Sequence, residues 1–152
     1  MLFRSKPITT ARPNAAGFVI TTSLAIPVGK HKITFHAKED GYMKAGEGSA
    51  TLVVSKASTD MHQTSMTAHK ATSVTLRATL IRKTDKMALP NQTVTFFVGG
   101  AKVGTGVTDA SGQASLAYTT PKSAGKYALK VTFAGDASYL KSVYSKAMLT
   151  VK

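Results

Sequence analysis

The chain has 152 residues, of which 43% are hydrophobic and 18% are charged. This composition is that of a folded globular protein and excludes a disordered chain. The absence of cysteine excludes disulfides, thiol catalysis and cysteine-ligated metals. The 20 Lys and Arg against 7 Asp and Glu give a net charge of +13, which attracts polyanions such as nucleic acid, anionic lipid or acidic glycan. The simpler interpretation is a soluble, lysine-rich surface.

The chain starts with MLFRSKPITT, in which no apolar segment precedes a small-residue cleavage site. No secretory signal is therefore visible, and the absence of any run of about 18 apolar residues predicts no membrane span. We expect a protein that either stays inside the cell or has been cut from a longer precursor.

Residues 1–55 repeat part of the C-terminal region. The stretch GKHKITFHAKEDGYMKAG at 29–46 is an imperfect copy of GKYALKVTFAGDASYLKS at 125–142, and the matches continue on either side. A repeat of this kind predicts two copies of one structural unit. The matched pairs are Asn14 with Asp109, Gly17 with Gly112, Gly29 with Gly125, Phe35 with Phe133, Tyr42 with Tyr139, and Lys44 with Lys141.

The first copy is incomplete. Counting back along the alignment, Phe3 falls opposite Val98, so the copy begins partway through the third strand of the unit. We predict that residues 1–55 form a partial repeat that lacks its first two strands. A partial sandwich exposes strand edges that can pair with another chain. Two hypotheses follow: the segment recruits strands from a neighbour and forms an oligomer or filament, or it is a fragment of a longer gene product.

The polar stretch KASTDMHQT, residues 56–64, predicts a short linker that allows limited swing between the copies. Residues 65–152 then show apolar and polar residues alternating with period two, which predicts strands. Clusters such as LPNQ, DASGQ and AGDASY separate the strands as turns. Six or seven short antiparallel strands predict a β-sandwich. Its expected core is Val74, Leu76, Val94, Phe96, Leu116, Leu129, Val131, Phe133, Leu149 and Val151.

The second copy resembles a known family through TVTFFVGGAKVGTGVTDASGQASLAYTTPKSAGKYALKVTFAGDASYLKS and the closing AMLTVK. These stretches resemble the bacterial immunoglobulin-like repeats that occur in tandem in large surface and secreted proteins. The resemblance implies an all-β fold, an immunoglobulin-like antiparallel β-sandwich with one complete copy plus a partial N-terminal copy. It also implies an extracellular or cell-surface location within a longer precursor.

The spacing of Gly125, Tyr127 and Leu129 looks like the tyrosine corner of immunoglobulin sandwiches, in which the hydroxyl bonds to nearby backbone. Leu129 then stands where antibody domains place a cysteine. The first copy departs from this pattern, with His31 in the place of Tyr127. The chain also lacks tryptophan, which argues against an antibody-type domain.

Two turn motifs have predicted structural roles. In TDASG, Asp109 can accept backbone hydrogen bonds and Gly112 can adopt a positive φ. In AGDASY, Asp136 shapes the loop and Tyr139 can fold its ring back over the end of the sandwich.

No catalytic, cofactor or metal site is predicted. His62 and His69 lie seven residues apart, whereas a metal site needs three or four convergent ligands. The acidic residues are too scattered for calcium, and neither a GxSxG elbow nor a phosphate-binding glycine loop is present. An intramolecular Lys–Asn amide would need a buried acid, but the acids of the second copy sit in predicted turns.

The leading hypothesis is a structural or adhesive module that spaces or presents a partner-binding unit, with a protein or a cell-surface glycan as partner. Self-association through the partial repeat is a further possibility. The alternative is a basic module that binds nucleic acid or another polyanion weakly, with Arg82, Lys83 and Lys86 as candidate contacts. Phe97 is the candidate for aromatic stacking, because the alternation that buries Phe96 turns Phe97 outward.

Overall fold

The computed structural model describes residues 26–37, 39, 42 and 44–152. The expectations for residues 1–25, including the matches of Phe3, Asn14 and Gly17, lie outside the described residues. Those described form strands and no helix. The strands are β1 (Gly29–Ala37), β2 (Gly46–Val54), β3 (Thr59–His62), β4 (Met66–Ala68), β5 (Ser73–Arg82), β6 (Thr93–Val98), β7 (Ala101–Val107), β8 (Gln113–Thr119), β9 (Gly125–Phe133) and β10 (Ser142–Val151).

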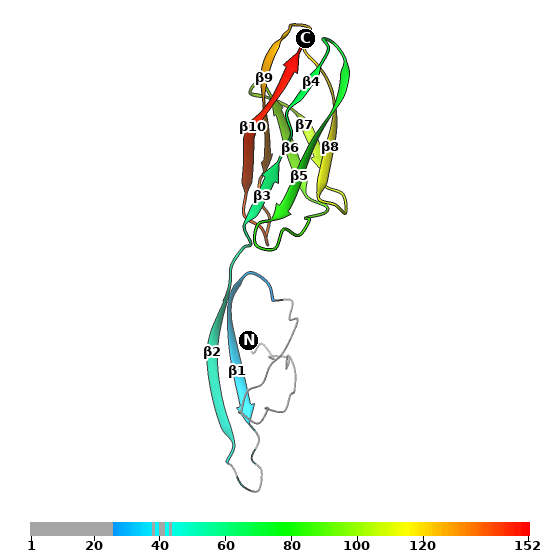
Figure 1. Cartoon of the computed structure of the whole chain (residues 1–152). Helices are drawn as coiled ribbons and strands as arrows, with labels where there is room; N and C mark the ends of the chain where they lie inside the picture. The colour runs from blue at the N-terminus through cyan, green and yellow to red at the C-terminus, as the bar shows by residue number, and fades with distance from the viewer. Residues whose placement is uncertain (1–25, 38, 40–41, 43) are drawn as a thin grey trace.

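The strands form a two-stranded hairpin, β1–β2, followed by a two-sheet sandwich (Figure 1). The five-stranded sheet has the order β4-β10-β9-β6-β7, and the three-stranded sheet has the order β3-β5-β8. All neighbouring strands are antiparallel except β4 and β10, which are parallel. The all-β, immunoglobulin-like sandwich predicted from the sequence is confirmed.

The core lies between the two sheets of the sandwich, where alternate residues of each strand point inward. Eight of the ten expected core residues are at most 4% exposed, and Val94, Phe96 and Leu129 are fully buried. The exceptions, Val74 and Leu116, are partly buried and pack against the core from its margin.

The sandwich begins earlier than the sequence suggested. Residues 59–62, assigned above to a linker of 56–64, form β3 and pair with β5, while Ala57 bridges to Tyr139. The linker assignment is therefore wrong for these residues. The strand was missed because four residues are too few to show an alternation, although Met61 is buried in the core. After His62 the chain crosses to the other sheet, where it continues as β4.

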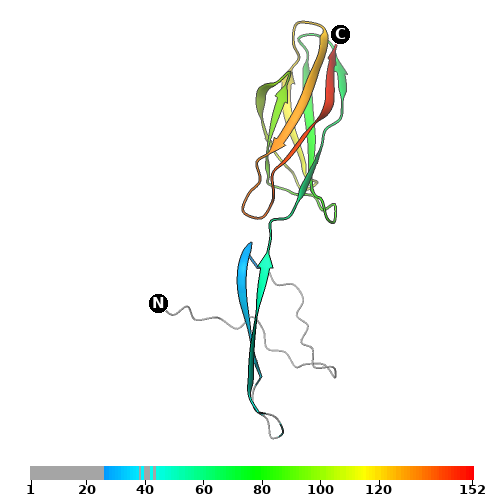
Figure 2. The same ribbon diagram turned by 90° about the vertical axis from the view of Figure 1, so that its left-hand side faces the viewer.

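The hairpin repeats the geometry of β9 and β10. Both β1 and β9 have nine residues, and each begins at one of the two matched glycines. At the far end, Ala37 pairs with Gly46 as Phe133 pairs with Ser142. The strands have equal length, so Ala37, rather than Phe35, occupies the strand position of Phe133. The hairpin extends from the end of the sandwich opposite the C-terminus (Figure 1 and Figure 2).

Candidate functional site

The inner face of the hairpin is defined by residues that pair directly across β1 and β2 and therefore point to the same side. His31 pairs with Leu52, and Ile33 pairs with Ala50. Leu52 and Ile33 are only partly buried, and Ala50 is exposed. The inner face is thus apolar and open to a considerable degree.

The same positions in the complete copy form sandwich core. Tyr127 pairs with Leu149, and Leu129 pairs with Ala147. Leu129 and Leu149 are fully buried beneath the three-stranded sheet. The comparison indicates that the inner face of the hairpin has the residue types and register of a surface that a second sheet can cover.

The hairpin also has strand edges that the complete copy covers. In the sandwich, β6 pairs with the second edge of β9, and β4 pairs with the second edge of β10. Among the described residues, no strand pairs with the second edge of β1 or of β2. These edges present backbone N–H and C=O groups that can form a ladder with another strand.

His31 replaces the tyrosine-corner residue in geometry as well as in sequence. The Tyr127 hydroxyl donates to Ser123 O at 3.0 Å, and His31 Nε2 lies 2.7 Å from Pro27 O. Each bond spans four residues and leads into the first strand of its hairpin. Because Pro27 O is an acceptor, Nε2 of His31 carries the proton in this bond.

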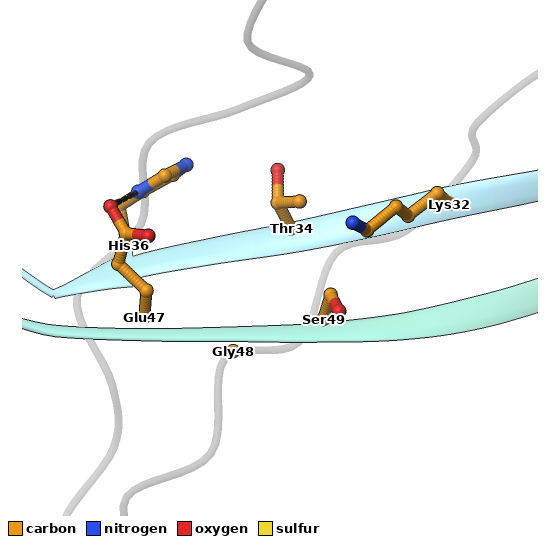
Figure 3. A pocket seen from close by; sticks show the side chains of 6 residues that line it. All are labelled: Lys32, Thr34, His36, Glu47, Gly48 and Ser49. Carbon is orange, nitrogen blue, oxygen red and sulfur yellow. Dashed lines mark hydrogen bonds and ion pairs between the residues drawn. The ribbon is translucent and has the colours of Figure 1, made fainter.

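The outer face of the hairpin carries a shallow polar hollow (Figure 3). Its only hydrogen bond between the side chains drawn joins His36 Nδ1 to Glu47 Oε1 at 2.9 Å across the two strands. Both side chains are largely exposed, so solvent screens their attraction. Nowhere in the described part of the chain do three or more His, Cys, Asp or Glu residues gather to hold a metal ion. The hollow is lined by Lys32, Thr34, His36, Glu47, Gly48 and Ser49.

A second polar hollow lies where the chain crosses between sheets after β3. Gln63 is buried there, and its Oε1 has no hydrogen-bond partner. The rings of His62 and Tyr144 lie 5.9 Å apart at the same place, and Arg77 donates to Gln113 Oε1 at 2.6 Å. An unpaired buried carbonyl costs about 1–3 kcal/mol, which a bound water would reduce.

The loop containing Asp136, between β9 and β10, lies where the hairpin meets the sandwich. Asp136 Oδ1 accepts hydrogen bonds from the backbone N–H groups of Ser138 and Tyr139, both at 2.7 Å. The loop then bonds the chain that arrives from β2: Ala57 N donates to Ser138 O, and Leu140 N donates to Ala57 O, each at 2.9 Å. We call this arrangement, residues 56–59 with 135–140, the joint. Tyr139 anchors the joint by packing against the core.

Asp109 and Gly112 hold the turn between β7 and β8. Asp109 Oδ1 accepts from the backbone N–H of Ser111 at 2.8 Å and of Gln113 at 3.0 Å. The Ser111 hydroxyl bond and these backbone bonds hold the pKa of Asp109 below its ordinary value. Gly112 has a φ of +74°. These hydrogen bonds stabilise the turn between β7 and β8.

The three basic residues singled out in the sequence, Arg82 at the end of β5 and Lys83 and Lys86 in the loop that follows, lie beside an acid of that loop. Arg82 Nε donates to Asp85 Oδ1 at 2.8 Å, and Arg82 Nη2 bonds to Asp85 Oδ2. The hydrogen bond from Arg82 lowers the pKa of Asp85 to about 2. Lys83 and Lys86 are exposed. Because Asp85 engages the charge of Arg82, the loop offers a polyanion only two unpaired cations.

Phe97 lies in a different basic environment, which sequence reasoning missed. It pairs with Lys102 of β7 on one side and with Lys130 of β9 on the other. Lys130 Nζ lies 4.7 Å from the centre of the Phe97 ring. These residues are far apart in the sequence, so only the strand register reveals their proximity.

Comparison with protein-family models identifies a family that the chain matches. The family model described as bacterial Ig-like domain (group 3) matches residues 58–152, more than half of the chain. The match begins one residue before β3 and so covers the whole eight-stranded sandwich. No curated protein matches the chain. Among the residues that the structure describes, no helix has the length and apolar character needed to cross a membrane.

Proposed function

The chain belongs to the bacterial Ig-like domain family, group 3, and on this premise we propose that it is a non-enzymatic structural or adhesive module of an extracellular or cell-surface protein from a bacterium or phage. In this role it spaces neighbouring parts of the protein and takes up strands from a partner at its hairpin. The family as a whole suggests a structural or adhesive role.

The joint supports the spacer role. Only residues 55–58 separate β2 from β3, and they are bonded to the loop of residues 135–140. Lys56 Nζ donates to Asp136 O at 2.5 Å, and Thr59 Oγ1 donates to Leu140 O at 2.9 Å. A connection this short and this well bonded restricts the movement of the hairpin relative to the sandwich, so force can be transmitted from one to the other.

The match between the two hairpins carries the strand-uptake proposal. In the sandwich, β6 pairs with β9 from Leu129 to Phe133. The equivalent edge of β1 runs from Ile33 to Ala37. The proposed occupant is therefore a segment like β5–β6 of an Ig-like repeat. One strand of this segment would pair with the edge of β1, and the other would cover the inner face. Main-chain hydrogen bonds and the burial of apolar side chains would provide its affinity.

A labelled peptide with the sequence of residues 73–98 tests this proposal on the full chain. We expect saturable binding, measured by fluorescence anisotropy. Ile33→Lys should weaken it about tenfold or more, because it places a charge on the inner face that the peptide covers.

Thr34→Lys is the matched control, because Thr34 is next to Ile33 but points to the outer face. This variant should leave binding nearly unchanged. If the peptide does not bind, or if both variants weaken it equally, strand uptake at the hairpin is wrong.

A further inference from the structure

The charged side chains on the strands of the five-stranded sheet are all positive. Its strands contain four lysines and no Asp or Glu, whereas the three-stranded sheet contains Asp60. No described acidic residue forms an ion pair with any of the four lysines. Their charges are therefore free to meet an anionic partner. The four are Lys102, Lys126, Lys130 and Lys146.

Three of these lysines and Phe97 form a row across the sheet. Phe97 pairs with Lys102 on one side and Lys130 on the other, and the bulged segment of β10 opposite Lys130 contains Lys146. All three lysines are exposed, and Phe97 is partly buried between them. Because neighbouring strands lie about 4.8 Å apart, the row spans roughly 14 Å. We call Lys102, Phe97, Lys130 and Lys146 the lysine row.

A β-bulge places Lys102 in the row. The register of β6 and β7 shifts between Phe96 and Phe97, so that Phe96 pairs with Gly104 while Phe97 pairs with Lys102. Without the extra residue, Val103 would stand opposite Phe97. Bulges redirect side chains in this way and often mark functional positions in sheets.

We propose that the lysine row binds an anionic polysaccharide, whose sulfate or carboxylate groups contact the lysines while the Phe97 ring holds the Lys130 ammonium in position. The geometry at Phe97 and the proposed function favour this partner over single-stranded nucleic acid. The Lys130 ammonium lies over the ring, where a stacked base would have to sit. The cell-surface location in the proposed function, on which this choice of partner rests, also brings the row near acidic glycans.

The test compares two charge-matched double variants of the full chain. One is Lys102→Gln with Lys130→Gln, and the control is Lys83→Gln with Lys86→Gln, which removes the same charge from the exposed loop near Asp85. Affinity for heparin, a sulfated polysaccharide, is measured at several salt concentrations. The row variant should bind about tenfold more weakly at low salt with a shallower salt dependence, because two ionic contacts are lost. The control should retain near wild-type affinity.

Phe97→Thr separates the aromatic contribution from the charge. Threonine suits a strand, so the sheet should form normally, as a thermal melt can verify. We expect weaker heparin binding with an unchanged salt dependence, because no charge is removed. If Phe97→Thr binds as the wild type does, the row acts through charge alone and the positioning of Lys130 by the Phe97 ring is wrong.

Three results would overturn the proposal. They are no heparin binding even at low salt, an equal loss in both double variants, and tighter binding of oligo(dT) than of heparin. The last would assign the row to nucleic acid. None of these results depends on the hairpin, because the heparin experiment changes residues of the sandwich only, whereas the peptide experiment changes only Ile33 and Thr34 of the hairpin. The failure of either proposal is therefore distinguishable from failure of the other.

Discussion

At Gly112 the fold depends on the absence of a side chain. Its φ is +74°, and an added Cβ would lie 2.5 Å from Leu80 O and 3.2 Å from Leu89 N. We expect Gly112→Ala to lower the free energy of unfolding by roughly 2–4 kcal/mol, because the left-handed conformation and the backbone clash both oppose it. Urea denaturation measures the change. Gly100→Ala separates the two causes: Gly100 has a φ of +89° but open space around it, so about 1 kcal/mol is expected there.

The Arg82–Asp85 pair predicts a pH dependence. Arg82 lowers the folded-state pKa of Asp85 from 3.8 to about 2, so the pair favours the folded state whenever the carboxyl is ionised. This contribution is present above pH 3.8 and disappears as the pH falls through 2. Asp85→Asn should therefore lower the melting temperature at pH 6 slightly and lose this difference near pH 2. A difference that persists undiminished at pH 2 would contradict this account.

At the scale of elements, the sequence predicts the long strands well and their lateral arrangement poorly. In β5, β6 and β9 the alternation runs for six residues or more, and their inward residues form most of the core. The four residues of β3 carry too short a pattern, so its strand was assigned to a linker. The repeat alignment also identified His31 as the counterpart of Tyr127, because residue type and spacing survive in the chain.

Register is the part that sequence reasoning could not reach. Which residues face each other across strands depends on turn lengths and bulges. A bulge in β7 brings Lys102 opposite Phe97, and the alternation of residues along β7 does not give the resulting register. Clustering along the chain instead pointed to Arg82, Lys83 and Lys86, but the same loop contains Asp85, which binds Arg82. Basic residues that are close in the sequence are thus a weaker guide to a candidate anion-binding site than basic residues that are close across a sheet.

At the scale of the whole molecule, the AGDASY motif has a role beyond its own loop. Asp136 orders residues 135–140, and these residues hold Ala57, where the hairpin meets the sandwich. A motif of the sandwich is therefore bonded to the segment that leads from the hairpin, and we predict that it restricts the direction of the hairpin. In a tandem array this arrangement would propagate a regular geometry from repeat to repeat, which suits a spacer.

Asp136→Ala tests this coupling. The variant removes the two hydrogen bonds that the Asp136 carboxylate accepts within the loop, so the joint should loosen and the hairpin should sample a wider range of directions while the sandwich stays folded. Because the chain has no cysteine, Val53→Cys and Lys126→Cys can carry a pair of spin labels whose distance distribution reports the swing. We expect a broader distribution in Asp136→Ala than in the labelled parent. Asp109→Ala is the control, since it removes a similar turn-capping carboxylate from the β7–β8 turn, which shares none of the hydrogen bonds between residues 56–59 and 135–140, and should leave the distribution unchanged. If both variants broaden it equally, or if neither does, the loop does not set the orientation of the hairpin, and the rigidity of the connection must come from the strands themselves.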